Sequence, residues 1–369
     1  MTSPRLTSVS VVIDNYNYAR FIRDAIDSAL AQTWPAVEVV VVDDGSTDDS
    51  AQVIGEYAGR VRAVLKENGG QASAFNAGFT GSTGDVVVFL DSDDVLHPEF
   101  CERAVRALDA APGSTVVQTR MRTVDAELRP LGHTVPPAYV ALADGDVAAD
   151  VRRWTTGSSF SPQGSAVFRR STLDALFPLP ADELRQGADF YMLRGAALLG
   201  PVVGIDEALV DYRSHGANDS NLATLDLGGV RRALERYVVY GRLLTALAGR
   251  LHLAAPMDPV RAPDPLFLTQ RMVSARLAPA EHPITGDTPA RLAVAGVRAV
   301  LARRDIRPVP RLLHATWFVL VACAPTRLAH LLATRLMLPL SRSGGSAESP
   351  SRAGRLRALV RRPLARQAG

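Results

Sequence analysis

Short apolar runs alternate with stretches of helical spacing along the first hundred residues. Four runs rich in β-branched residues predict strands, at 8–13, 37–42, 60–65 and 85–90. Apolar positions recur at helical spacing between them, at 21–30, 50–57 and 71–79. Strands that alternate with helices predict a parallel sheet, and the unbroken apolar run in 85–90 indicates a strand that is buried on both faces.

Polar loops follow three of these predicted strands, after Ile13, Val42 and Leu90. Ligands of parallel sheets bind beyond the carboxyl ends of the strands. We therefore expect the three loops to meet at one crevice.

The rest of the chain predicts a further strand at 114–121, an irregular stretch at 130–157, and helices at 171–177 and 189–199. A long amphipathic helix at 230–253 and a proline-containing linker at 256–265 come next, and then an Arg- and Ala-rich, mainly helical region. The length of 369 residues suggests about two domains. We expect an α/β catalytic domain at 1–221, a helical C-terminal region at 222–341 and a basic tail at 342–369.

Charge is distributed unevenly although the net charge is only +3. Through Val230 the chain has 31 acidic and 18 basic residues, and after it 7 acidic and 23 basic residues. An acidic body concentrates cations at its clefts, whereas a basic region suits an anionic surface. The apolar stretch at 315–324 is too short to span a bilayer. Together with 328–340 and the arginines of the tail, it either lies at an anionic membrane interface or forms a packed helical hairpin.

Two cysteines far apart in sequence, Cys101 and Cys323, indicate neither a disulfide framework nor a zinc site. The N-terminus has no signal-peptide pattern, so we expect a mature start and a cytoplasmic location, peripheral on the inner face of the membrane if the basic region binds lipid. Nucleic acid is a less favoured partner because the basic tail has few aromatic residues.

Three carboxylates, Asp91, Asp93 and Asp94, follow the buried strand at 85–90. Such a cluster becomes favourable when a divalent cation neutralises it, and oxygen ligands suit Mg²⁺ or Mn²⁺ that also holds a diphosphate. The alternative is that Asp91 and Asp94 cap a helix that begins near Pro98. The pair Asp43 and Asp44 has a similar alternative as a turn.

Taken together, the segments at 9–17 (VSVVIDNYN), 41–48 (VVDDGSTD), 68–78 (NGGQASAFNAG) and 90–94 (LDSDD) resemble the landmarks of family 2 glycosyltransferases. The resemblance covers about residues 8–221. It implies an α/β fold of the GT-A type, followed here by the mainly helical C-terminal region. It also implies metal-assisted, inverting transfer of a sugar from a nucleotide-diphosphate sugar to an acceptor hydroxyl.

The resemblance implies a role for each matching residue. Tyr16 packs on the base, Asp44 accepts its ring N–H, which favours a UDP-sugar, and Asp91 holds the ribose. The residues that it assigns to the nucleotide sugar are Asn15, Tyr16, Asp43, Asp44, Gln71, Asn76 and Asp91, and those that it assigns to the metal are Asp93, Asp94 and His215.

Inversion requires a base opposite the leaving diphosphate, and the segment 186–191 (QGADFY) resembles the family segment that supplies it, which makes Asp189 the candidate. Its alternative is a helix N-cap, and the alternative for His215 is a solvated loop residue. Arg169 and Arg170 precede the acceptor side or only cap a helix. Two departures from the family are Asp14 with Asn15, and Ala188, which stands before the base where an acid is common.

The acceptor implied by this reading is a saccharide or a lipid-linked saccharide, in cell-envelope or polysaccharide synthesis. A processive synthase is disfavoured because its Gln-x-x-Arg-Trp segment does not follow Asp189. A nucleotidyltransferase and a phosphoacceptor domain are disfavoured because the first requires a Gly-rich basic loop and the second a lysine on a late strand, whereas Lys66 is the only lysine. The main alternative is a catalytically silent scaffold that binds a nucleotide sugar.

Overall fold

The alternation of strands and helices is present in the computed structural model, which describes residues 6–155, 159–215 and 226–334. The strands are β1 (Val9–Asn15), β2 (Val37–Asp43), β3 (Arg62–Leu65), β4 (Val86–Asp91), β5 (Val95–Leu96), β6 (Val116–Val124), β7 (Pro130–Val135), β8 (Ala166–Arg169) and β9 (Val202–Arg213). The helices of the α/β region are α1 (Ile22–Leu30), α2 (Ser50–Gly55), α3 (Gln71–Gly81), α4 (Phe100–Ala110), α5 (Ala148–Arg153), α6 (Arg170–Leu176) and α7 (Ala188–Leu199). Those that follow are α8 (Leu227–Arg250), α9 (Pro265–Leu277), α10 (Pro289–Ala302), α11 (Pro308–Cys323) and α12 (Thr326–Leu332).

Nine strands form one sheet in the described part of the chain, in the order β3-β2-β1-β4-β8-β6-β9-β5, with β7 paired to β6. The first four are parallel to one another, β8 runs antiparallel between β4 and β6, and β9 is parallel to β6. The register pairs Asp14 with Asp91 and Asn15 with Asp43, so the carboxyl ends of β1, β2 and β4 lie level. The predicted convergence of three loops is confirmed.

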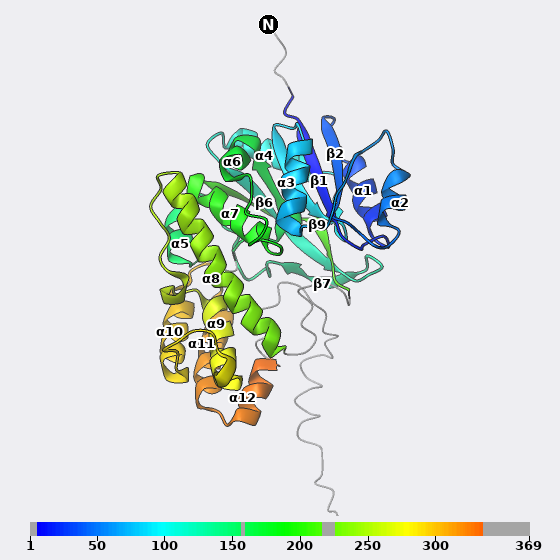
Figure 1. The fold of residues 1–369 in the computed structure, drawn as a ribbon. Coiled ribbons are helices and arrows are strands. Elements are labelled where there is room, and N and C mark those ends of the chain that lie inside the picture. Colours follow the sequence, from blue (N-terminus) through cyan, green and yellow to red (C-terminus); the bar gives the residue numbers. More distant parts are fainter. Residues whose placement is uncertain (1–5, 156–158, 216–225, 335–369) are drawn as a thin grey trace, which may run out of the picture.

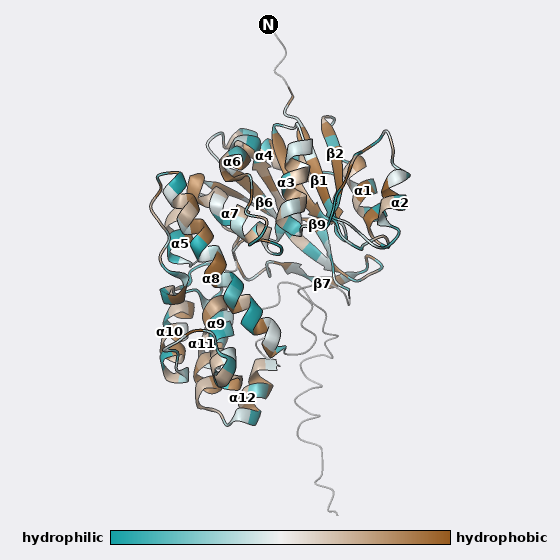
Figure 2. Cartoon of the chain, viewed as in Figure 1, coloured by the Kyte–Doolittle hydropathy of each residue, from teal (hydrophilic) through white to brown (hydrophobic). Residues whose placement is uncertain are grey.

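Two apolar layers enclose the sheet, because its alternate residues face opposite sides. Val11 and Ile13 face α1 and α4, whereas Val12 and Phe89 face α3, α6 and α7. Figure 2 shows the central strands as mostly hydrophobic. Helix α3 lies so close to β1 that a Cβ atom on Gly78 would meet Val12 at 2.2 Å.

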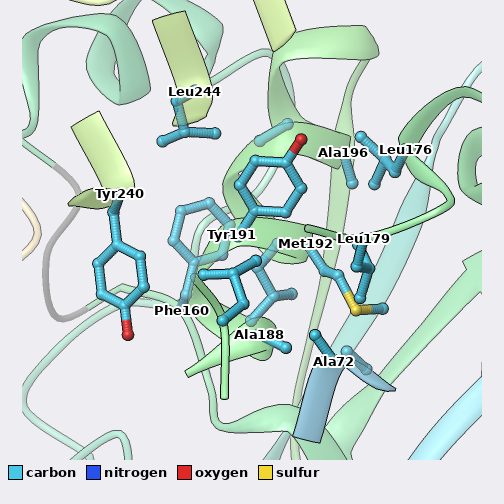
Figure 3. Packing of buried hydrophobic residues seen from close by; sticks show 14 of the residues in the cluster. Ala72, Phe160, Leu176, Leu179, Ala188, Tyr191, Met192, Ala196, Tyr240 and Leu244 are labelled. Atoms are coloured by element: carbon cyan, nitrogen blue, oxygen red, sulfur yellow. The ribbon is translucent and has the colours of Figure 1, made fainter. Parts of the chain in front are cut away.

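Helix α8 connects the α/β region to the helices that follow it (Figure 1). Its buried side chains extend the apolar layer of α7, and Figure 3 shows Met192 of α7 and Leu244 of α8 in one cluster with Leu176 and Leu179. Helices α9 to α12 build a separate apolar cluster around Trp317 and Phe318. The domain boundary at 221/222 stays a prediction. Helix α8 packs on α7, which precedes this boundary, and on α9, which follows it.

Three stretches differ from the sequence-based expectations. The stretch at 130–157, predicted to be irregular, contains β7 and α5, and β9 was not predicted at all. Residues 256–265 are not a linker: they include a short 3-10 helix (Pro259–Arg261), Pro259 is buried, and the indole N–H of Trp154 donates to the carbonyl of Met257 at 2.9 Å. Tertiary packing stabilises these segments, and local periodicity does not report it.

The apolar stretch at 315–324 lies within α11, whose Trp317, Phe318 and Val321 are buried against neighbouring helices. One face of α11 is therefore packed against other helices, as the helical-hairpin alternative predicted. Among the residues that the structure describes, no helix combines the length and the apolar composition needed to cross a bilayer. The basic tail and residues 335–341 lie outside the described residues.

The two cysteines are predicted to differ in reactivity with a thiol reagent. Cys101 is buried in α4, and burial raises the pKa of its thiol to about 12, whereas Cys323 is exposed. Because the thiolate is the reactive form, we expect Cys323 to react in the native protein and Cys101 to react only after unfolding. Colorimetric thiol titration of wild type and of a Cys323→Ser variant measures this, and rapid reaction of two thiols in the native protein would contradict it.

Candidate active site

A cavity of about 880 Å³ opens at the level carboxyl ends of β1, β2 and β4. One end of it, which we call the nucleotide-loop end after the role predicted for its loops, is lined by Asn15, Tyr16, Asp44 and Gln71. Asp91, Asp93 and Asp189 also line the cavity. Beyond Asp189 its wall comes from α8, α9 and α11, with Tyr240, Leu266, Pro310, Arg311 and His314. The α/β region and the C-terminal helices therefore share one cavity.

Asp44 lies at the nucleotide-loop end with its carboxylate held from three sides. Lys66 Nζ donates to it at 2.5 Å, and the amides of Gly69 and Gly70 donate at 3.0 and 2.7 Å. Gly70 has a φ of +82°, and a Cβ atom there would meet the backbone of Arg185 at 2.8 Å, so this position requires glycine. Tyr16 is 46% exposed at the same end, where its ring is accessible to a ligand.

Asp43 and Asn76, both assigned to the nucleotide sugar by resemblance, do not line the cavity. Asp43 accepts from Asn15 Nδ2 at 2.8 Å and from the Ser46 amide at 3.2 Å, which is the turn alternative noted for it. Asn76 bonds the backbone of Leu179 through both ends of its amide, at 2.8 and 2.9 Å. Their observed contacts order the loops around the cavity.

A chain of hydrogen bonds crosses the cavity floor through Gln71. Gln71 Oε1 accepts from the Ala188 amide at 2.9 Å, and Gln71 Nε2 donates to Gln163 Oε1 at 2.9 Å. Gln163 Nε2 then donates to Asp14 Oδ1 at 3.1 Å. The start of α7 is thus connected to the end of β1.

Acidic side chains gather in the centre of the cavity. Burial, together with the nearby charges of Asp93 and Asp44, raises the pKa of Asp14 to about 8. Burial also raises the pKa of Asp91 well above its usual value, as do the charges of Asp14, Asp94, Asp93 and Asp189. These carboxylates repel one another, so a bound cation would be stabilised among them.

Asp93 lines the cavity and is bonded to His215 Nε2 at 2.9 Å. The ring of His215 stacks on Phe21 at 4.7 Å and its side chain is buried, which excludes the solvated alternative. Asp94, also predicted as a metal ligand, does not line the cavity: its Oδ1 accepts from the amide of Arg213 at 3.0 Å. Of the two carboxylates predicted to hold the metal, the structure brings Asp93 to the cavity.

The helix-cap alternative for Asp91 and Asp94 is wrong. Helix α4 begins at Phe100 with Glu99 in the N-cap position and has no side-chain cap bond. By contrast, Arg169 does cap a helix: its guanidinium donates to the carbonyls of Leu108 and Ser114 near the end of α4.

The residues fit a divalent cation that takes part of its coordination from a ligand. In the ranges that the structure describes, no three His, Cys, Asp or Glu side chains are arranged as a complete metal site. One carboxylate and one imidazole, Asp93 and His215, are in contact, and the buried Oδ2 of Asp94 nearby has no hydrogen-bond partner. Mg²⁺ in nucleotide sites uses one or two protein carboxylates together with phosphate oxygens and water.

Asp189 lies in the first turn of α7, where the amide dipoles favour a carboxylate. The N-cap is Gly187, so the cap alternative for Asp189 is wrong; Gly187 has a φ of +76°, and a Cβ atom there would meet the Tyr240 hydroxyl at 1.8 Å. Burial raises the pKa of Asp189, and the charge of Arg194 partly opposes that rise. Its charge also acts on Asp91 across the cavity.

Sequence reasoning missed Arg194, Arg213 and Gln163. Arg213 is 2% exposed and holds the acidic loop through the Asp93 carbonyl at 2.8 Å and Asp24 at 2.6 Å. Arg194 is the one charge in an otherwise apolar run, 190–199, and that isolation was the available signal. Gln163 had no comparable signal, because its partners come from distant segments.

The comparisons with known proteins agree with this geometry. Residues 10–177 match the family model described as glycosyl transferase family 2. An uncharacterized glycosyltransferase of Nostoc sp. is 35% identical over 215 residues, which are 57% of this chain and 66% of that protein. The chondroitin synthase of Pasteurella multocida is 39% identical over 126 residues, which are 33% of this chain and 13% of that protein.

Among solved structures, the crystal structure of S. aureus TarS 1-349 in complex with UDP-GlcNAc matches with a TM-score of 0.54 at 18% identity, over 88% of each chain. At this identity the likeness concerns the fold, and it confirms the α/β fold of the GT-A type followed by helices. The family match over 10–177 includes, apart from Val9, the four motif segments on which the resemblance was based, so it agrees with that resemblance. Residues 10–177 of this chain therefore carry a glycosyl transferase family 2 domain, as the motifs implied.

Proposed function

We propose that this chain transfers a sugar from a nucleotide-diphosphate sugar to an acceptor hydroxyl with inversion, and that Asp189 is the general base. The observation that carries the proposal is that Asp189 lines the same cavity as the loops after β1 and β4 and as the C-terminal helices. One end is built from the loops that the family uses for its donor, and the other from the C-terminal helices.

In this mechanism the Asp189 carboxylate takes the proton of the acceptor hydroxyl while the hydroxyl oxygen attacks the anomeric carbon of the donor sugar. The bond from that carbon to the diphosphate breaks, and its electron pair goes to the leaving phosphate oxygen. Tyr16 and Asp44 hold the base of the donor, with a UDP-sugar favoured. Asp93 and His215 would hold Mg²⁺ or Mn²⁺, which neutralises the charge of the leaving diphosphate.

Loss of the base should separate catalysis from donor binding. We expect Asp189→Asn to reduce turnover by about 10²-fold or more, because the amide cannot accept the proton, while donor affinity stays within about twofold. Nucleotide release from UDP-, GDP- and dTDP-sugars measures turnover, and calorimetry measures affinity. Asp174→Asn, at an exposed position on α6, is the matched control. Donor binding by wild type without turnover under any acceptor would favour the scaffold alternative.

The pH dependence should report the environment of Asp189. Its pKa is raised by burial, and only the deprotonated form accepts a proton, so activity falls as the pH drops through that raised pKa. We expect the acidic limb of kcat to lie above the usual aspartate value of about 4. Donor affinity measured over the same pH range is the control, and a limb at the usual value in kcat contradicts the assignment.

Chelation tests the cation. We expect EDTA to abolish turnover and added Mn²⁺ or Mg²⁺ to restore it in wild type, because the leaving diphosphate then loses and regains its counter-charge. In Asp93→Asn the same additions should restore little activity. Full turnover in EDTA would remove the metal from the proposal.

We also propose that the chain acts at the inner face of the cytoplasmic membrane in cell-envelope or polysaccharide synthesis. Helix α11 exposes Val309, Leu312 and Leu313 at 59–70%, and α12 exposes Leu328 and Leu331 at 46–50%. These apolar side chains lie in the basic half of the chain, a combination that suits an anionic lipid surface.

Vesicle binding tests the membrane contact. Wild type should sediment with vesicles that contain phosphatidylglycerol, less at high salt, and Leu312→Glu with Leu313→Glu should reduce binding several-fold because it places charge in the apolar surface. Leu65→Glu, an exposed leucine on β3, is the matched control. Equal sedimentation of the α11 variant and wild type would reject this surface.

A further inference from the structure

One arginine in the cavity has no protein partner that accounts for its burial. Arg194 is 3% exposed and lines the cavity between two aromatic rings, with its Cζ 3.4 Å from the centre of Phe190 and 5.4 Å from that of Phe160. Among the described residues its guanidinium makes no hydrogen bond or ion pair. Its nearest charged neighbours, Asp189 and Asp264, act on it only through space.

A buried, unpaired guanidinium is costly, so its presence in a cavity needs a physical reason. Stacking on Phe190 offsets part of the cost but satisfies none of the five N–H donors. Asp264 accepts from the Phe267 amide and from the Tyr237 hydroxyl, and it accepts no hydrogen bond from Arg194. The planar donors of Arg194 are thus available to a ligand.

Two further arginines line the same part of the cavity. Arg236 of α8 donates to Gln186 at 2.7 Å, and Arg311 of α11 donates to the carbonyl of Arg303 at 2.7 Å. Neither forms an ion pair with an acid among the residues that the structure describes. This part of the wall therefore has an excess of positive charge, whereas the centre of the cavity is rich in carboxylates.

Arg194 follows the proposed base on α7 and lies close to α8. It stands one turn and a half after Asp189 on α7, and the groups that act on its charge include Tyr237 and Tyr240 of α8. Phe160, Leu193 and Leu266 give the surrounding wall an apolar character. Guanidinium groups bind phosphate with two parallel hydrogen bonds, and a phosphate ester brings the negative charge that this wall lacks.

We propose that the C-terminal half of the cavity is an acceptor subsite that takes a phosphate ester, with the phosphate held by Arg194 beside the hydroxyl that Asp189 deprotonates. The inference rests on the proposed function, since it assigns the acceptor class of the same site. The phosphate belongs either to a lipid-linked acceptor or to a polyol phosphate, and the two sources share this chemistry.

The test is calorimetric binding of two phosphate esters, glycerol 3-phosphate and farnesyl phosphate, to the full chain with saturating UDP and Mg²⁺ to fill the donor end. Uncharged glycerol is the comparison probe. We expect wild type to bind at least one ester and Arg194→Met to bind it about 10- to 100-fold more weakly, the range for a charge-assisted hydrogen bond. Arg194→Lys should be intermediate, and Arg298→Met, at an exposed position on α10, should match wild type.

Two further readouts separate the outcomes. Because Arg194→Met removes an unpaired buried charge, its thermal midpoint should not fall; a lower midpoint with unchanged ester affinity would make the arginine structural and overturn the inference. If Arg194→Met binds UDP more weakly and the ester with unchanged affinity, the Arg194 charge belongs to the donor site, and this result would also overturn the inference. Wild type that turns over a donor but binds neither ester refutes the inference alone, whereas failure to bind or turn over any donor refutes the proposed function.

The relative affinity of the esters identifies the source. Similar affinities support recognition of the phosphate alone, as in a polyol phosphate. Much tighter binding of farnesyl phosphate supports a lipid-linked acceptor whose chain lies on the apolar wall. Either result supports the subsite only if Arg194→Met weakens binding of the same ester.

Discussion

Burial and mutual repulsion of a group of carboxylates are the constraint around which this cavity is built. The register of β1 and β4 sets Asp14 beside Asp91, and the following loop adds Asp93 and Asp94. Burial raises the pKa values of Asp14 and Asp91, and repulsion from the neighbouring carboxylates raises them further. The charge of Arg213 opposes the rise in the pKa of Asp94, and its guanidinium holds the loop through Asp24 and the backbone of Asp93.

Helix α7 is the second organising element, because it separates regions of opposite charge. Its first turn carries Asp189, and Arg194 follows on the same helix between aromatic rings. Gly187 allows the helix to start directly against Tyr240 of α8. A carboxylate and an unpaired guanidinium on one helix thus face the carboxylate-rich centre and the arginine-lined C-terminal part of a single cavity.

The parts of the fold that the sequence predicted are those with strong local periodicity. Strands β1, β2 and β4 and helices α1, α3 and α7 were expected within a few residues, and the convergence of their loops followed from parallel-sheet topology. Strand β9 was missed because a long pairing with β6, and not its own alternation, stabilises it. Arg213 and Gln163 act through partners more than a hundred residues away, so no local pattern identifies them.

The position of α8 has a consequence for how the protein can be divided. The family match ends at residue 177, before Asp189, yet Leu234, Tyr237 and Leu244 of α8 are buried in the same apolar layer as α7. A fragment that stops before α8 would leave that layer open to water and would lose one wall of the cavity. The α/β half is thus not a self-contained module: a folded chimaera must carry a helix equivalent to α8 that covers this apolar layer.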